Sequence, residues 1–256
     1  MRRSSAVAVA AALLSMAAAG CAPPAAPAPP APAPAPAAPA TTVARRLPND
    51  VHWVRASAEY RALALQTFLL AGERLPALAR GRAAGTWGVV LDADETVLDN
   101  SEYQRRRALL DSGYSSASWD AWVRERAATP VPGAPRFTQL VRELGGRVAI
   151  VTNRTESVCA VTRENLAAVG VAADVVLCQA PGESDKNPRF QRLQAGTASP
   201  GLPALTVVAW VGDNIQDFPG LTQAVRDDPT ALADFGRRFF LLPNPMYGSW
   251  ERSPER

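Results

Sequence analysis

Hydrophobic residues fall into five short runs that alternate with helical patterns between residues 87 and 242. Runs of this length with few polar residues are typical of strands buried on both faces of a sheet. They occupy residues 87–91, 147–151, 174–177, 205–211 and 238–242. Helical patterns over residues 134–144, 156–169 and 187–195 each stop at a glycine. The alternation predicts an α/β fold with a doubly wound parallel sheet and a ligand crevice at the carboxyl ends of its strands.

Two segments depart from this alternation. From residue 49 to about residue 75, apolar residues recur at steps of three and four, which predicts an N-terminal region of one long helix or two. We expect Pro76 to end or kink it. Residues 100–132 are richer in aromatic and charged residues and have a helical pattern at residues 118–127. We expect them to form a small, mainly helical insertion above the strand ends.

The beginning of the chain has the pattern of an export signal. Arg2 and Arg3 precede an apolar run over residues 6–19 that is too short to span a bilayer, so residues 1–20 are predicted to be a signal peptide. The small residues before Cys21 resemble a bacterial lipoprotein cleavage site, which predicts that Cys21 is lipidated. Ordinary secretion with cleavage nearby is the alternative.

A low-complexity stretch separates this signal from the folded part. Residues 22–40 contain only Ala and Pro and favour extended polyproline II. We therefore predict a tether over residues 21–46 and a folded domain over residues 47–256. Export permits a disulfide between Cys159 and Cys178, and two free buried thiols are the equal alternative.

Composition narrows the chemistry further. The net charge is +3, and no clustered basic face favours nucleic acid as a partner. The chain has a single His, His52, which disfavours zinc sites built on His pairs and phosphatases that use a phosphohistidine. Lys186 is the only Lys beside 26 Arg, which indicates a position where a guanidinium cannot replace an ammonium.

Polar residues follow the predicted strands at the edge where the crevice is expected. They are Asp92 and Asp94 after the first strand, Thr152 and Asn153 after the second, Lys186 before the helix that follows the third, and Asp213 and Asp217 after the fourth. Crowded carboxylates repel one another, and a hard cation relieves that repulsion. Oxygen ligands without His indicate Mg²⁺ rather than Zn²⁺.

This set of side chains suits phosphoryl transfer. A carboxylate beside a cation can attack phosphorus, and a second carboxylic acid can protonate the leaving alcohol and then activate water. A hydroxyl and an ammonium can hold the remaining phosphate oxygens. Phosphoryl transfer depends mainly on such positioning and charge stabilisation.

The motifs resemble those of a known superfamily. The segment DADET, followed in order by Thr152, Lys186 and Asp213, resembles the four motifs of the haloacid dehalogenase phosphohydrolases. Over residues 50–251 the resemblance narrows to the bacterial class C acid phosphatases, which are outer-membrane lipoproteins with four catalytic aspartates. It rests on the segments SAEYRALALQTF, LDADETVLDNSEY, ATPVPGA, IVTNR, VGDNIQDF and LLPNPMYGSWE.

The resemblance implies a role for each matching position. Asp92 corresponds to the nucleophile and Asp94 to the general acid and base. The implied phosphate ligands are Thr152, Asn153 and Lys186, and the implied Mg²⁺ ligands are Asp92, the carbonyl of Asp94, Asp213 and Asp217. Trp119 and Tyr247 correspond to aromatic residues that sandwich a base, whereas Trp122 is expected in the core. Asp99 and Asn100 are expected to brace the first motif without a chemical role.

The implied function is a Mg²⁺-dependent acid phosphatase that hydrolyses phosphomonoesters, such as nucleoside 5'-monophosphates or nicotinamide mononucleotide, through an aspartyl-phosphate. Sugar or small aryl phosphates are alternative substrates, and a surface lipoprotein that binds nucleotides without turnover is a second alternative. The implied location is outside the cytoplasm, lipid-anchored in the outer membrane or facing the periplasm. The resemblance leaves a homodimer open.

Overall fold

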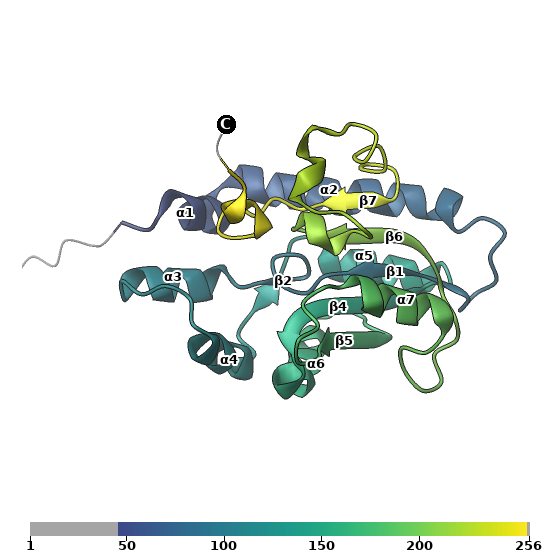
Figure 1. Cartoon of the computed structure of the whole chain (residues 1–256), viewed down its shortest axis with the longest axis horizontal. Coiled ribbons are helices and arrows are strands. Elements are labelled where there is room, and N and C mark those ends of the chain that lie inside the picture. Colours follow the sequence, from purple (N-terminus) through teal and green to yellow (C-terminus); the bar gives the residue numbers. More distant parts are fainter. Residues whose placement is uncertain (1–45, 255–256) are drawn as a thin grey trace, which may run out of the picture. The chain divides into compact units, whose positions relative to one another are not determined.

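Five parallel strands form the main sheet of residues 46–254, the part of the chain that this computed structural model describes (Figure 1). The strands are β1 (Trp87–Leu91), β4 (Arg147–Thr155), β5 (Val175–Gln179), β6 (Thr206–Gly212) and β7 (Phe239–Leu241). Their order is β5-β4-β1-β6-β7. The chain builds outward from β1 on one side and then on the other, so the predicted doubly wound α/β fold is confirmed and its switch point lies between β1 and β6.

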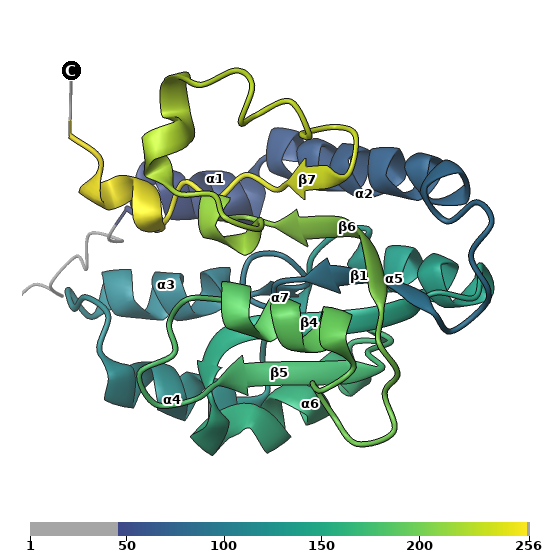
Figure 2. The same cartoon turned by 45° about the vertical axis from the view of Figure 1, so that its right-hand side comes forward.

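Helices cover both faces of this sheet (Figures 1 and 2). They are α2 (Ala58–Leu78), α5 (Ala134–Glu143) and α6 (Cys159–Ala168) on one face and α7 (Asn187–Ala195) on the other. Gly145, Gly170 and Gly196 all have positive φ, as expected where helices end in a left-handed residue. The glycine stops that the sequence predicted are therefore real helix ends.

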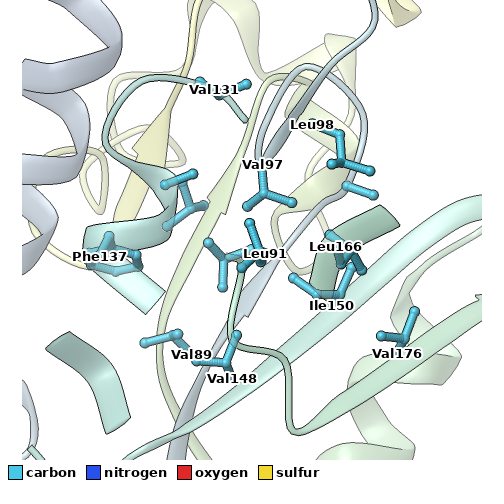
Figure 3. Packing of buried hydrophobic residues seen from close by; sticks show 14 of the residues in the cluster. Val89, Leu91, Val97, Leu98, Val131, Phe137, Val148, Ile150, Leu166 and Val176 are labelled. Carbon is cyan, nitrogen blue, oxygen red and sulfur yellow. The ribbon is translucent and has the colours of Figure 1, made fainter. Parts of the chain in front are cut away.

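Alternate residues of the central strands serve the two faces. Val89 and Leu91 of β1 pack with Ile150 against residues of α5 and α6, among them Phe137 and Leu166 (Figure 3). Neighbouring residues of the same strands, among them Val90 and Val151, join the cluster that includes α7. Each fully buried aliphatic side chain contributes about 1.5–3 kcal/mol relative to exposure. Burial on both faces explains why these strands are continuous apolar runs.

The N-terminal helical region is two helices, α1 (Asn49–Ala56) and α2. Ser57 between them is extended, and its hydroxyl accepts a hydrogen bond from the Tyr60 N–H at 3.0 Å, which caps α2. Of the two expectations for Pro76, an end or a kink, the helix does not end there, because α2 continues two residues further to Leu78. A proline this close to a helix end removes few hydrogen bonds, and the Ala79 N–H closes the last turn on the Leu75 carbonyl at 2.8 Å.

The insertion contains two helices and a short antiparallel pair. These elements are β2 (Leu98–Asp99), α3 (Ser101–Leu109), α4 (Ser116–Glu125) and β3 (Thr129–Pro130). The arrows of the main sheet point toward α3 and α4 (Figure 2). α4 lies two residues earlier than predicted because Ser115 and Ser118 form a capping box, and Arg126 ends it with φ of 55°. α3 gave no periodic signal because only Ser101 and Tyr103 of its residues are buried.

Short 3₁₀ helices complete the described elements at Glu156–Val158, Ile215–Asp217, Gln223–Asp227 and Ser249–Arg252. Within residues 46–254, no helix combines the length and hydropathy needed to cross a membrane. The predicted signal peptide over residues 1–20, the lipidation site Cys21 and the tether up to residue 45 lie outside the described residues.

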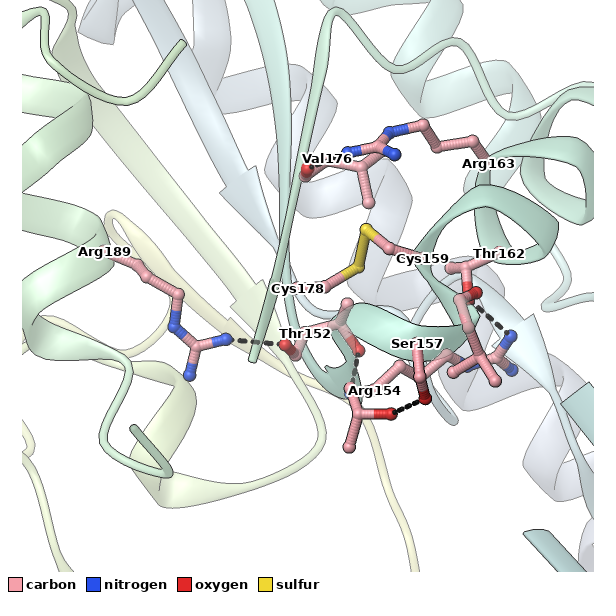
Figure 4. The surroundings of a disulfide bond; sticks show 11 residues. Thr152, Arg154, Ser157, Cys159, Thr162, Arg163, Val176, Cys178 and Arg189 are labelled. Atoms are coloured by element: carbon pink, nitrogen blue, oxygen red, sulfur yellow. Dashed lines mark hydrogen bonds between the residues drawn. A yellow bond between two sulfur atoms is a disulfide. The ribbon is translucent and has the colours of Figure 1, made fainter. Parts of the chain in front are cut away.

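A disulfide joins Cys159 at the start of α6 to Cys178 in β5 (Figure 4). Of the two alternatives that the sequence left open, the structure contains the bonded one. The two cysteines are 19 residues apart, so the bond closes a loop that contains most of α6. In the chain-entropy model, closing a loop of this length raises the free energy of the unfolded chain by about 3 kcal/mol, because the closed loop has fewer conformations.

We predict that the double substitution Cys159→Ser and Cys178→Ser lowers the free energy of unfolding by about 3 kcal/mol, because the unfolded chain regains the entropy of the open loop. Urea unfolding followed by circular dichroism measures the change. The same loss is expected when the unsubstituted protein is reduced, and the double variant should not respond to reductant. An unchanged unfolding midpoint in both cases would show that the bond is not formed.

Candidate active site

Three carboxylates converge at the carboxyl ends of β1 and β6, at the switch point of the sheet. Asp92 follows β1 directly, Asp213 follows β6, and Asp217 ends the 3₁₀ turn after it. One oxygen from each carboxylate lies within 4.8 Å of one from each of the others. Asp92 and Asp217 are buried, and Asp213 is half-buried. The sequence prediction that these residues meet in one crevice agrees with this geometry.

Gly212 makes the approach of Asp217 possible. A β-carbon placed on Gly212 would lie 2.3 Å from the β-carbon of Asp217 and 2.4 Å from its Oδ2. β6 therefore needs glycine as its last residue so that Asp217 can fold back over it. The Asn214 N–H donates to Asp217 Oδ2 at 2.9 Å and fixes the returned carboxylate.

Lys186 supplies the positive charge of the site. It stands directly before α7, and its ammonium donates to Asp92 Oδ1 at 2.5 Å and to Asp217 Oδ1 at 2.6 Å. The residue is only 5% exposed. Burial lowers the pKa of the Lys186 ammonium, but the carboxylates of Asp217 and Asp92 outweigh this effect and raise the pKa above its ordinary value. Lys186 is therefore charged and buried between two acids.

Burial also controls the acids themselves. It raises the pKa of Asp92 from 3.8 to about 7; Lys186 opposes the rise, while Asp217 and Asp94 add to it. Burial and the charges of Asp217 and Asp92 raise the pKa of Asp213 well above its usual range. One ammonium thus does not balance the three negative charges. The donor set consists of carboxylate oxygens, which suits a hard divalent cation such as Mg²⁺, so the residues present fit a metal.

Two residues that sequence reasoning did not single out orient Asp213. The Thr96 hydroxyl donates to Asp213 Oδ1 at 3.0 Å, and the Asn244 amide donates to Oδ2 at 2.8 Å. Thr96 belongs to the first motif and Asn244 to the segment after β7. The segment LLPNPMYGSWE contained the signal for Asn244, but only the fold shows which carboxylate its amide reaches.

Asp94 faces a different set of partners from Asp92. Its Oδ1 accepts hydrogen bonds from Asn100 Nδ2 at 2.9 Å and from Arg154 Nε at 2.9 Å, and Arg154 Nη2 lies 2.7 Å away. Its side chain is absent from the carboxylate group described above, so the carbonyl is the part of Asp94 left for the predicted metal role. Asn100 braces the first motif as expected, whereas the role of Arg154 was missed.

Glu95 holds the loop of the first motif in a tight conformation. It has φ of 54°, a left-handed conformation that costs a non-glycine residue about 1–2 kcal/mol. Its buried carboxyl accepts from the Asn100 N–H at 2.9 Å, which anchors the turn. Burial, together with the charges of Asp94 and Asp213, raises the pKa of Glu95 well above its usual range. Glu95 therefore shapes the loop through its hydrogen bond with the backbone of Asn100.

The second motif lies at the end of β4. Thr152 is fully buried, and its carbonyl accepts from Arg189 of α7 at 2.6 Å (Figure 4). The amide of Asn153 accepts from the same Arg189 at 2.5 Å and donates to the Ser184 carbonyl at 2.9 Å. Arg189 thereby joins the second motif to the loop that carries Lys186. The phosphate roles of Thr152, Asn153 and Lys186 stay predictions, and the Asn153 side chain is already engaged by its neighbours.

The two predicted base-binding residues come from different segments, the insertion and the segment after β7. Trp119 of α4 is half-buried, with its ring edge-on to Tyr103 at 5.0 Å and under the guanidinium of Arg154 at 5.6 Å. Tyr247 is half-buried in the segment that carries Asn244, the partner of Asp213. Trp122 is buried, as predicted, and its indole N–H donates to Asn100 at 2.9 Å.

Comparison with known proteins agrees with this geometry. Residues 17–250 match the model of the HAD superfamily, subfamily IIIB (acid phosphatase). The chain belongs to this family. Two solved structures of the class C acid phosphatase from Bacillus anthracis, one with tungstate bound, are 31% identical to it. In each, the match covers 79% of this chain and 85% of the other, with a TM-score of 0.69.

A plant relative is more distant. Acid phosphatase 1 of Solanum lycopersicum is 25% identical over 159 residues, which is 62% of this chain and 57% of the tomato protein. The chain thus spans little more than half the length of this curated relative. Membership of the class C acid phosphatases, predicted from the motifs, is confirmed by the family match and the Bacillus anthracis structures.

We predict that Mg²⁺ stabilises the metal-free protein more at pH 7 than at pH 5. The pKa of Asp92 is raised to about 7 in the folded state, so the folded protein loses stability as the pH rises from about 4 to 7 and the carboxyl is forced to ionise. A bound cation compensates the negative charge of the ionised Asp92 carboxylate and so stabilises the folded protein. With saturating Mg²⁺ we expect Tm to rise by about 5 °C or more at pH 7.

Thermal unfolding at the two pH values, with Mg²⁺ and with a chelator, measures this difference. Asp213→Asn is expected to remove most of the shift because it takes away one of the three carboxylates. Asp228→Asn is the matched control, since Asp228 is exposed and accepts hydrogen bonds that an Asn also accepts. An equal rise in Tm on addition of Mg²⁺ at both pH values would contradict the prediction.

Proposed function

We propose that this protein is a Mg²⁺-dependent acid phosphatase that hydrolyses phosphomonoesters through an aspartyl-phosphate on Asp92. The observation that carries the proposal is the convergence of Asp92, Asp213 and Asp217, with the ammonium of Lys186 paired to Asp92 and Asp217. Membership of an acid phosphatase family supports it. The related Bacillus anthracis enzyme binds tungstate, and tungstate is a tetrahedral oxyanion like phosphate.

The proposed first half-reaction transfers the phosphoryl group to the enzyme. A carboxylate oxygen of Asp92 attacks phosphorus, a P–O bond to Asp92 forms, and the ester P–O bond breaks. The electron pair of the broken bond leaves with the alcohol oxygen, which takes a proton from the Asp94 carboxyl. Thr152 and Lys186 hold the phosphate oxygens during the transfer.

The second half-reaction releases phosphate. Asp94, now a carboxylate, removes a proton from a water molecule whose oxygen attacks phosphorus. The bond between phosphorus and Asp92 breaks, inorganic phosphate leaves, and both aspartates return to their starting states. Asp92, the Asp94 carbonyl, Asp213 and Asp217 would hold a Mg²⁺ ion, whose positive charge would stabilise the phosphate oxygens and offset the crowded carboxylates.

Nucleoside 5'-monophosphates and nicotinamide mononucleotide are the substrates that we propose. Trp119 lies on the insertion next to the partner of Asp94, where a ring can stack on the base of a leaving nucleoside. Stacking tolerates different bases, so a broad range of substrates is expected. Sugar and small aryl phosphates are the alternative. Nucleotide binding without turnover under any metal would favour a binding protein.

The first residues of the chain support a proposal for where the protein acts. We propose export and anchoring by a lipid on Cys21, in the outer membrane or facing the periplasm, with the Ala and Pro tether holding the domain away from the lipid surface. The lipid is the only membrane contact in this proposal. A homodimer is compatible with it.

We expect Asp92→Asn to abolish phosphate release from nucleoside monophosphates, because the amide cannot form the acyl-phosphate. The loss should exceed about 1,000-fold in kcat, and chelation of metal should abolish activity of the unsubstituted enzyme as well. Colorimetric phosphate assays measure both effects, with Asp228→Asn as the control that keeps full activity. Activity that survives in Asp92→Asn, or that is indifferent to metal, would refute the proposal.

Trp119→Ala tests the substrate class. We expect kcat/KM for a nucleoside monophosphate to fall about 10- to 100-fold, the value of one stacking contact, while kcat/KM for glycerol phosphate changes little. The unstacked ester is the internal control for damage to the site. Equal losses for both substrates would show that Trp119 does not bind the base.

A further inference from the structure

Arg154 is a buried cation that the proposed reaction does not yet use. Its side chain is fully buried. Its guanidinium reaches Asp94 through Nε and Nη2, and Asn100 Oδ1 through Nη2 at 3.1 Å. Its Nη1 donates to Thr162 Oγ1 at 3.4 Å (Figure 4). A guanidinium held at all three nitrogens cannot rotate freely, so Arg154 is a rigid support for whatever it touches.

Arg154 and Asn100 donate hydrogen bonds to only one of the two carboxyl oxygens of Asp94. Oδ1 accepts hydrogen bonds from Asn100 Nδ2 and Arg154 Nε and lies 2.7 Å from Arg154 Nη2. These three donors fill the capacity of Oδ1 to accept hydrogen bonds. Among the described residues, no donor reaches Oδ2. A proton on the Asp94 carboxyl therefore resides on Oδ2, because Oδ1 is surrounded by N–H donors. The pair of Arg154 and Asn100 thus selects which oxygen carries the proton and where it points.

The same guanidinium touches the insertion. Its central carbon lies 5.6 Å from the ring centre of Trp119, within the range of a cation–π contact. Trp122 of the same helix donates to Asn100 Oδ1 at 2.9 Å. The helix that carries the proposed base-binding ring is therefore joined, through Arg154 and Asn100, to the carboxyl that protonates the leaving group.

We infer that Arg154 is a positioning residue that presents Oδ2 of Asp94 to the leaving-group oxygen and fixes its place relative to Trp119. The inference rests on the proposed function, because it assigns Arg154 to the proton-transfer step of that reaction. Arg154 touches neither phosphorus nor the leaving oxygen in this scheme. It acts through Asp94, with Asn100 as its partner.

The inference predicts a dependence on the leaving group. An alkoxide is a poor leaving group and needs the proton from Asp94, whereas p-nitrophenolate leaves without it. Benzyl phosphate and p-nitrophenyl phosphate are a matched pair, since both carry one aromatic ring and differ in the oxygen that departs. Damage to acid catalysis lowers kcat/KM for the benzyl ester alone, and general damage to the site lowers both.

We expect Arg154→Lys to lower kcat/KM for benzyl phosphate at least about 30-fold more than for p-nitrophenyl phosphate, within the range of a lost general acid. Arg163→Lys is the control, because Arg163 of α6 donates to the Val176 carbonyl at 3.0 Å and, within the described part of the chain, forms no hydrogen bond or ion pair with Asp94 or Asn100. Asn100→Ser leaves the Arg154 contact with Asp94 in place and should also lower kcat/KM for benzyl phosphate more than kcat/KM for p-nitrophenyl phosphate. It provides the test if Arg154→Lys does not fold. Equal losses for the two esters in a folded variant would overturn the inference.

A double-substitution cycle with Asp94→Asn separates positioning from structure. If Arg154 acts through Asp94, adding Arg154→Lys to Asp94→Asn leaves the ratio of the two esters unchanged. A further change in that ratio would also overturn the inference. Failure of the proposed function is distinguishable, because then the unsubstituted enzyme with Mg²⁺ hydrolyses neither ester.

Discussion

Three largely buried carboxylates have oxygens within 4.8 Å of one another, and among the described residues one ammonium, that of Lys186, pairs with two of them. Burial is the main reason why the pKa of Asp92 rises to about 7; Lys186 opposes the rise, and the repulsion from Asp217 and Asp94 adds to it. The ammonium of Lys186 fits between two carboxylate oxygens at 2.5 and 2.6 Å. A planar guanidinium is wider and prefers paired oxygens on one side. Steric fit thus explains why this position has the single Lys of the chain, although 26 other basic residues are Arg.

The topology of the sheet is what brings these charges together. β1 and β6 are neighbours although more than 110 residues separate them, so the residues that follow each strand meet across the switch point. β4 lies on the other side of β1 and brings Thr152 to the same edge. Arg189 of α7 then links the Thr152 carbonyl to the loop of Lys186. A change in the packing of α7 therefore acts on two motifs together.

Much of this arrangement could be predicted from sequence because the signals were local. Buried strands gave apolar runs, helix ends gave glycines, and the first motif followed its strand at once. α3 could not be predicted because the charged side chains of SEYQRRRAL pair on the surface and few residues are buried. The disulfide and the partners of Asp94 and Asp213 depend on contacts between distant segments. Arg154 was visible in the sequence, but its role depends on where Asp94 comes to rest.

The two carboxylates of the motif Asp-Ala-Asp form ion pairs with different cations. Asp92 pairs with the ammonium of Lys186, and Asp94 pairs with the guanidinium of Arg154. An ammonium is a compact charge on a flexible stem, so it can share its hydrogen bonds with an arriving phosphate while Asp92 attacks. A guanidinium with hydrogen bonds to three residues keeps Asp94 in one orientation. Ala93 between them packs in the hydrophobic core, and each carboxylate of the motif has its own cation as a partner. The proposed division of labour between nucleophile and acid therefore follows from which cation each aspartate meets.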